Sequence, residues 1–409
     1  MTNNRLTSKN SAKTNAEEPG AAVSSSSGAP AKTSSVTNKT SEALEHPSCG
    51  HNAASEHPSC GHNAASEHPS CGHNTTHATH ALMFAVLCAA FVVVFICSLG
   101  LGTYHIAPLD VVALIAGLPT SESLQDAAMA HSLIWDVRIP RVCAAALIGA
   151  GLSCAGAVFQ GLFRNPLASP YTLGVSNGAG FGAALAIVLS ANVVGIQLTS
   201  IACGLVAVLL TFLIAAQGKK STVTLILSGM LIGSLFASLV ALLKFCADPT
   251  EKLPQIVYWL MGSLSGITSA SLLSIVPFYC ICLLLILLSR WRINVLSMGD
   301  TTAASFGIHV ARERGIIICA ASVLTALLVS IAGIIGWIGI VVPHLSRMLM
   351  GPNFKQLIPT SCVLGGAYLI IIDDICRCAT ALEIPLGVIT GIVGVPLFLY
   401  FIRKKKVDW

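Results

Sequence analysis

The sequence predicts an all-α polytopic membrane protein with about ten transmembrane helices and a disordered N-terminal tail. Hydrophobic residues make up 54% of the 409 residues and charged residues only 10%, which is far from the balance of a soluble globular domain. After residue 81, apolar runs long enough to cross a bilayer alternate with short polar breaks. The basic residues fall at the ends of these runs, so the net charge of +5 does not indicate a nucleic-acid-binding face.

Residues 1–80 form the predicted tail. They are rich in Ser, Thr, Ala, Asn and Lys and contain almost no large apolar side chain, so they cannot bury enough surface to offset the entropy lost on ordering. No secretory signal is visible, because the first hydrophobic run begins near Ala81 and is long enough to span.

An eleven-residue repeat, EHPSCGHNAAS, occurs nearly intact three times in the tail. Imidazole and thiolate groups bind zinc and related transition metals, so metal buffering or sensing is one interpretation, and a duplicated tail without function is the other. One unit supplies three ligands at most, and the spacing is not that of a folded zinc finger. The candidate metal ligands are His46, Cys49, His51, His57, Cys60, His62, His68, Cys71 and His73.

The transmembrane domain is expected over residues 81–403, followed by a basic C-terminus, 404–409. Pro343 lies in the eighth run, which is short, so a kinked or broken helix is expected there. Most of the cysteines lie within these runs, where cysteine behaves as a small hydrophobic residue, so no disulfide scaffold is expected. The predicted spans are 82–101, 141–162, 171–191, 196–216, 222–244, 269–289, 315–334, 336–350, 356–376 and 385–402.

The loop charges predict the orientation. With the tail in the cytoplasm, nearly all basic loop residues fall on the cytoplasmic side, as the positive-inside rule requires, and both termini are cytoplasmic. Two longer connections face the other side: residues 102–137, with the possible interfacial helix APLDVVALIAG, and residues 246–268, where Tyr258 and Trp259 suit an interface belt. The basic loop residues are Arg164, Lys219, Lys220, Arg290, Arg292, Arg312, Arg314, Lys355, Arg403 and Lys404 to Lys406.

The stretch from Arg138 to Gly182 reads as two membrane helices joined by a tight turn. Charged side chains are costly at the bilayer centre, so Arg138 and Arg141 are expected at one interface and Arg164 at the other. The turn, RNPLASP, contains two prolines that interrupt the helix and free backbone groups. Glycines at four-residue spacing in the second helix, Gly174, Gly178 and Gly182, permit close helix packing.

Four stretches carry a family resemblance: RIPR followed by GAGLSCAGAVFQGLFRNPLASPYTLGVSNGAG, SMGDTTAASFGI from Ser297, GWIGIVVPHLSRMLMG from Gly336, and EIPLGVITGIVGVPLFLY from Glu383. Together they resemble the FecCD/BtuC-like permease subunit of binding-protein-dependent ABC importers for iron-siderophores, haem and vitamin B12. The resemblance covers roughly residues 82–403. It implies the fold of a type II ABC importer permease.

The resemblance implies a coupling helix in the polar connection from Arg290 to Arg314. This helix would dock into the ATP-hydrolysing subunit, and its N-cap is expected at Asp300 or Thr301. The alternative is an ordinary solvated loop helix. The coupling residues are Gly299, Asp300, Ala303, Ala304, Phe306 and Gly307.

The resemblance also implies that Arg138, Arg141 and Arg377 dock acidic residues on a substrate-binding protein. The alternative for the first two is anchoring at lipid headgroups, and for Arg377 it is neutralisation of Asp373 or Asp374.

Two further sites follow from the resemblance. Asn165, Leu167 and, less securely, Thr222 match a cytoplasmic gate, although Asn165 at a proline break also suits helix capping. His344 and Arg347 match a family motif, and a membrane histidine of this kind is expected to be a packed structural residue.

The resemblance implies a permease that pairs with a second permease chain, identical or related, in a bacterial cell membrane. The expected partners are two ABC ATPase subunits, an extracytoplasmic substrate-binding protein and membrane lipid, with no nucleic acid. ATP hydrolysis belongs to the ATPase, so this chain is expected not to be an enzyme and to need no cofactor in the permease domain. Zinc or another transition metal is the candidate ligand of the tail. The implied cargo is a ferric-siderophore or haem, with cobalamin second, carried by alternating access.

Two other classes stay open. A secondary transporter would place ionisable residues near mid-membrane, where these spans have almost none. A metal-ion permease with a metal-sensing tail draws its support from the repeats alone.

Overall fold

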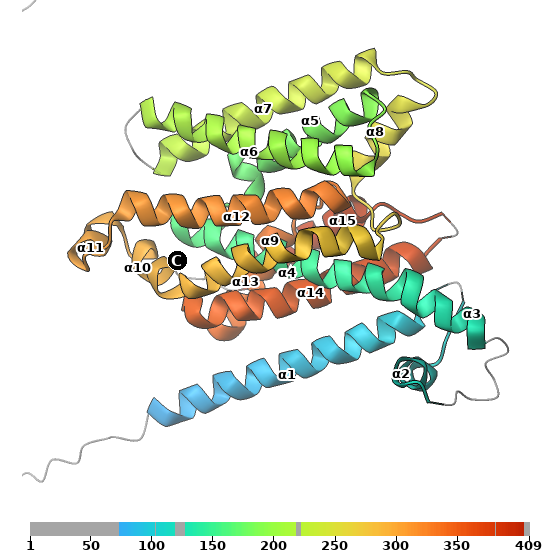
Figure 1. Cartoon of the computed structure of the whole chain (residues 1–409). Coiled ribbons are helices and arrows are strands. Elements are labelled where there is room, and N and C mark those ends of the chain that lie inside the picture. The colour runs from blue at the N-terminus through green and yellow to red at the C-terminus, as the bar shows by residue number, and fades with distance from the viewer. Residues whose placement is uncertain (1–72, 103, 119–126, 218–221, 381, 405–409) are drawn as a thin grey trace, which may run out of the picture. The chain divides into compact units, whose positions relative to one another are not determined.

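The computed structural model describes residues 73–102, 104–118, 127–217, 222–380 and 382–404, and all secondary structure in these ranges is helical (Figure 1). Of the predicted disordered tail, residues 1–80, residues 1–72 lie outside these ranges, whereas residues 73–80 belong to α1 and are helical. The helices are α1 (His73–Gly100), α2 (Pro108–Ala116), α3 (Ala127–Ser132), η1 (Leu133–Arg138), α4 (Ile139–Phe163), η2 (Pro170–Leu173), α5 (Val175–Val188), α6 (Val193–Gln217), α7 (Thr222–Cys246), α8 (Lys252–Met261), α9 (Ser269–Leu288), α10 (Arg290–Ser297), α11 (Asp300–Ser305), α12 (Val310–Ala332), α13 (Ile338–Met350), α14 (Phe354–Cys378) and α15 (Leu386–Lys404).

Ten apolar helices among the described residues correspond to the ten predicted spans. Seven are long and apolar enough to cross a membrane, and three shorter ones cover 175–188, 338–350 and 386–401. The interfacial helix expected after residue 102 is α2, and the connection 246–268 contains a further amphipathic helix, α8. Each predicted apolar run therefore contains one apolar helix, since a backbone in hydrocarbon must satisfy its own hydrogen bonds.

The first helix begins at His73, before the predicted start at residue 82. The residues from 73 to 81 are mostly polar, but they can extend the helix because each residue added to an existing helix gains one backbone hydrogen bond. Hydropathy alone marks only the apolar part of such a helix.

The second span also begins earlier than predicted, because one continuous helix runs from residue 128 to 163. Its N-terminal part contains the π-helical segment η1, in which the Ile139 N–H donates to the Ile134 carbonyl. Pro140 follows directly and has no N–H to donate, so the change from π to α register falls where a backbone hydrogen bond is missing in any case. Arg138 and Arg141 flank this change of register.

The third predicted span, 171–191, is split. Gly174 adopts a left-handed conformation (φ +76°) between η2 and α5, a conformation that glycine adopts without steric cost. As a result α5 has only 14 residues, about 21 Å of helix, which is short for a straight crossing.

Helix α4 is the centre of the packed helices, because it contacts α14, α12 and α13 along its length. Its side chains are buried almost throughout. Helices α5, α6 and α7 form one group against one side of α12, and α1 packs along α14 on the other side (Figure 1). The prediction of close packing by glycine is confirmed: Gly178 and Gly182 of α5 lie against the backbone of α6 at Cys203 and Thr199.

The N-terminus of α9 carries a capping box. The Ser271 N–H donates to Thr268 Oγ1 (3.2 Å), and the Thr268 N–H donates to Ser271 Oγ (3.1 Å). We expect Thr268→Ala to lower the free energy of unfolding by about 1 kcal/mol, measured by thermal unfolding in detergent. Ser274→Ala is the control, because the exposed Ser274 hydroxyl bonds only within the helix, to the Ser271 carbonyl; an equal loss in both variants would contradict the capping role.

Candidate functional site

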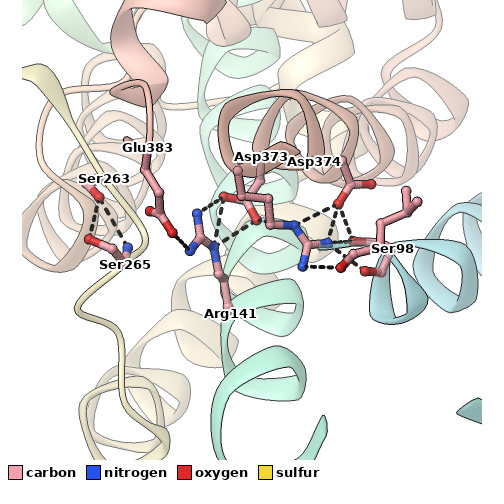
Figure 2. Close-up of polar contacts among 9 residues, drawn as sticks. Ser98, Arg141, Ser263, Ser265, Asp373, Asp374 and Glu383 are labelled. Carbon is pink, nitrogen blue, oxygen red and sulfur yellow. Dashed lines mark hydrogen bonds and ion pairs between the residues drawn. The ribbon is translucent and has the colours of Figure 1, made fainter. Parts of the chain in front are cut away.

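Three arginines and three carboxylates meet at one end of the helices, where α1 ends and α4 begins. We call this set the arginine network. Figure 2 shows Arg141 from α4, Asp373 and Asp374 from α14, and Glu383 from the connection to α15; Arg138 is the last residue of η1, and Arg377 lies on α14. Its members are Arg138, Arg141, Asp373, Asp374, Arg377 and Glu383.

Arg141 lies between two carboxylates. Its Nε and Nη2 donate to Asp373 at 2.9–3.1 Å, and its Nη1 donates to Glu383 Oε1 at 2.7 Å. The Asp373 side chain is 1% exposed and the Glu383 side chain 35% exposed. One edge of the guanidinium is therefore held by a buried acid and the other by a partly exposed one.

Arg377 and Arg138 hold the C-terminal end of α1. Arg377 pairs with Asp374 and donates to the Ser98 carbonyl (2.6 Å) and the Leu101 carbonyl (3.1 Å). Arg138 donates to the Leu99 carbonyl (2.6 Å) and to the Tyr104 carbonyl. The last carbonyls of a helix lack helical partners and carry partial negative charge, so the two guanidinium groups satisfy this helix end.

The structure thus brings the three predicted docking arginines together, but as buried side chains with internal partners. Their exposed fractions are 4% for Arg138, 9% for Arg141 and 9% for Arg377. The pairing of Arg377 with Asp374, and at 3.7 Å with Asp373, matches its alternative interpretation. Docking by these residues remains a prediction.

Sequence reasoning missed Glu383 as a member of this site. It lies 242 positions from its partner Arg141, and in the sequence it was only the first residue of a recognised stretch. One sequence feature could have identified it: Glu383 precedes an apolar span at the side of the membrane where the three arginines were expected, so it could have been predicted to pair with one of them.

A second charged cluster surrounds α11 at the opposite end of α4, about 38 Å away for a helix of 25 residues. Asp300 accepts hydrogen bonds from Arg314 Nη1 (3.1 Å) and Nη2 (2.5 Å). Arg164, the residue that caps α4, lies 3.5 Å from Asp300. The short helix is thereby held to both α12 and α4.

The expected N-cap at Asp300 or Thr301 is wrong. Gly299 caps α11 and Asp300 is its first helical residue, because the Asp300 carboxylate is drawn away to Arg314 instead of capping the helix. The hydrogen bonds from Arg314 lower the pKa of Asp300. A carboxylate with a lowered pKa keeps its pair above its ordinary pKa and loses it as pH falls through the lowered value, so the pair persists at neutral pH.

The other predicted coupling residues divide into a buried and an exposed set. Ala303 is fully buried and anchors α11, whereas Ala304 and Gly307 are exposed and Phe306 is 59% exposed. The exposed residues leave one side of α11 uncovered within the described residues, and docking of an ATPase there remains a prediction.

The predicted gate residues lie on two segments. Asn165 and Leu167 share the turn after α4, where the Leu167 N–H donates to Asn165 Oδ1 (2.9 Å) in an Asx turn. The helix caps on either side are Arg164 and Ser169, so the alternative of helix capping by Asn165 is wrong, and the gate remains a prediction. Thr222 is the first residue of α7. His344 is 3% exposed and packs edge-on against Phe398, as expected for a packed histidine.

The predicted metal ligands His46 to Cys71 lie outside the described residues, and His73 is described only as the first residue of α1. Within the described residues, no cluster of His, Cys, Asp or Glu could hold a metal ion. Metal binding by the repeats stays a prediction.

The FecCD transport family matches residues 90–404, which is most of the chain and all of its apolar spans after the start of α1. The chain belongs to the FecCD transport family. The cobalamin import permease BtuC of Halobacterium salinarum is 38% identical over 280 residues, 68% of this chain and 75% of that protein. The molybdate import permease MolB of Haemophilus influenzae is 36% identical over 316 residues, 77% of this chain and 93% of that protein.

A solved inward-facing structure of a metal-chelate type ABC transporter has the same fold. The TM-score is 0.73 with 35% sequence identity, and the match covers 80% of this chain and all of that one. This FecCD protein is therefore a membrane-embedded permease subunit of an ABC importer of the BtuC type. Permeases of this family are not themselves enzymes and work with an ATPase, a substrate-binding protein and a second permease chain.

Proposed function

We propose that this permease imports a ferric-siderophore or haem, or else cobalamin, by alternating access driven by a separate ATPase. The observation that carries the proposal is the pair of charged clusters, the arginine network and the Asp300 cluster, at opposite ends of α4. Such an arrangement suits a chain that meets one partner on each side of a membrane. A cobalamin permease and a metal-chelate transporter among its relatives support this class of cargo. The molybdate permease among them makes molybdate the main alternative cargo.

The distribution of basic residues supports a cytoplasmic Asp300 cluster. Arg164, Arg290, Arg312 and Arg314 all lie near α10 and α11 or the start of α12, and the positive-inside rule assigns such a surface to the cytoplasm. In this orientation both chain termini and the coupling helix α11 are cytoplasmic, and the arginine network faces the binding protein.

The charge content of the spans favours this proposal over a secondary transporter. Each long described span has at most two charged residues in its most apolar 18-residue stretch. The acids of α14, Asp373 and Asp374, lie near its C-terminal end and pair with arginines. An ion-coupled carrier needs ionisable groups along its path at mid-membrane.

Charge reversal at α11 tests the proposal. In Asp300→Arg, three arginines would meet where one carboxylate now joins Arg164 and Arg314, so α11 should leave its position. We expect at least a tenfold loss of ATPase activity and of complex formation when the permease is reconstituted with its candidate ATPase.

The double variant Asp300→Arg/Arg314→Asp is the matched rescue, because it restores an oppositely charged pair between α11 and α12. Recovery of most of the activity would tie the loss to this pair. Full activity in Asp300→Arg, or substrate uptake by the permease without any ATPase, would refute the proposal.

A further inference from the structure

We propose that Glu383 is a built-in competitor for Arg141: it occupies the Nη1 edge of that guanidinium until a carboxylate of the docking protein replaces it. The inference rests on the proposed docking of a substrate-binding protein at the arginine network. It adds a regulatory contact inside this chain, which masks the docking site while no partner is present.

The two carboxylates on Arg141 are not equivalent. Asp373 takes the Nε and Nη2 edge with three hydrogen bonds and is 1% exposed, whereas Glu383 takes Nη1 with one hydrogen bond and is 35% exposed (Figure 2). Removing Asp373 would leave Arg141 without its main hydrogen-bond partner in a buried position, which is costly. Glu383 can leave into water at small cost, so the Nη1 edge is the replaceable one.

The backbone around Glu383 is held, which leaves its side chain as the moving part. The Ile384 N–H donates to the Cys376 carbonyl (3.2 Å), and the Leu386 N–H donates to the Gly262 carbonyl (2.9 Å). These bonds tie the connection to α14 on one side and to the end of α8 on the other. Exchange at Arg141 then requires rotation between side-chain rotamers and no unfolding of the connection.

The chemistry of the site specifies an acidic partner. When Glu383 rotates away, Arg141 keeps Asp373, and the N–H donors of Nη1 lose their carboxylate partner. A carboxylate restores a charge-assisted hydrogen bond there, which is stronger than one with a neutral acceptor. Arg138 and Arg377 are neighbours in the network but donate to the carbonyls of α1, so Arg141 is the arginine whose partner can be exchanged without releasing a helix end.

A competitor of this kind lowers the apparent affinity by the fraction of molecules in which the site is open. Partly exposed ion pairs are weak, so removing Glu383 should tighten docking about threefold to fivefold. The gain should appear in the association rate constant, because the competitor acts before docking and is absent from the final complex.

The test measures docking to the complete permease–ATPase complex in phospholipid nanodiscs by surface plasmon resonance. The probe is the purified substrate-binding protein that is the candidate partner of this permease. Two variants remove the contact differently: Glu383→Gln removes the charge, and Glu383→Asp keeps the charge but shortens the side chain so that it falls short of Nη1. Both should bind the probe about threefold to fivefold more tightly, with faster association.

Glu251→Gln is the matched control for loss of a negative charge. Glu251 precedes α8, is highly exposed and pairs with Lys252 at 3.3 Å instead of with an arginine of the network. Its affinity for the probe should equal that of the wild type. If Glu251→Gln binds the probe as tightly as Glu383→Gln does, while Glu383→Asp binds like the wild type, general charge repulsion explains the effect. The role of Glu383 as a competitor is then refuted.

The salt dependence of the wild type separates this inference from the docking proposal. Docking through Arg141 must weaken as ionic strength rises from low to physiological salt; docking that is insensitive to salt overturns the proposed docking and the competitor together. Salt-sensitive docking with unchanged or weaker binding in both Glu383 variants overturns only the competitor, and Glu383 is then a residue that orients Arg141 for docking.

Discussion

Replacing Arg141 with methionine is expected to lower the free energy of unfolding by about 3–5 kcal/mol. The change leaves Asp373, which is 1% exposed, without the three hydrogen bonds that hold its charge. Arg377 is 3.7 Å from Asp373 and compensates only in part, because it is already paired with Asp374. Thermal unfolding of the detergent-purified permease, followed through labelling of its buried cysteines, measures the loss.

A double-mutant cycle identifies the cause. Arg141→Met/Asp373→Leu removes both charges and should recover most of the stability, because a buried pair can be replaced by apolar residues of similar volume with little loss. Arg292→Met is the control: its pair with Glu313 (3.2 Å) is half exposed on the arginine side, so it should cost less than about 1 kcal/mol. Equal effects for Arg141→Met and Arg292→Met would refute a stabilising role for the network.

A methyl group at Gly156 is expected to destabilise the protein by about 3 kcal/mol or more. Gly156 of α4 lies against the backbone of α13 at Gly339. A Cβ there would lie 2.6 Å from the carbonyl carbon and 2.7 Å from the Cα of Gly339, and closer still to its carbonyl oxygen. A backbone cannot rotate away as a side chain can, so the two helices must separate. Thermal unfolding of Gly156→Ala in detergent measures the effect.

Gly315→Ala is the matched control within α12. A Cβ at Gly315 meets no atom within 4 Å, so this variant should gain about 0.5–1 kcal/mol from the higher helix propensity of alanine. Destabilisation in both variants would show that glycine is required for a reason other than contact between α4 and α13.

Local patterns were sufficient to predict that each apolar run contains a helix, although they did not give the starts of the helices in the first three spans. A membrane helix satisfies its backbone within one segment, so each apolar run of adequate length identifies a helix without reference to its neighbours. The turn at Asn165 is local in the same way, since the bond that closes it comes from Leu167, two residues away. The failed N-cap at Asp300 shows the limit: Arg314, fourteen positions away, takes the carboxylate.

The sequence by itself therefore determined the membrane-embedded helical fold, the family and the positions of the charged residues at the span ends. Only the tertiary structure decided how those charges pair. Arg141 meets Asp373 and Glu383 across 232 and 242 positions, because α4 and α14 pack along each other. Whether an arginine faces water or pairs with a buried acid depends on which helices pack together. The local sequence pattern of one helix does not specify which other helix its buried face contacts.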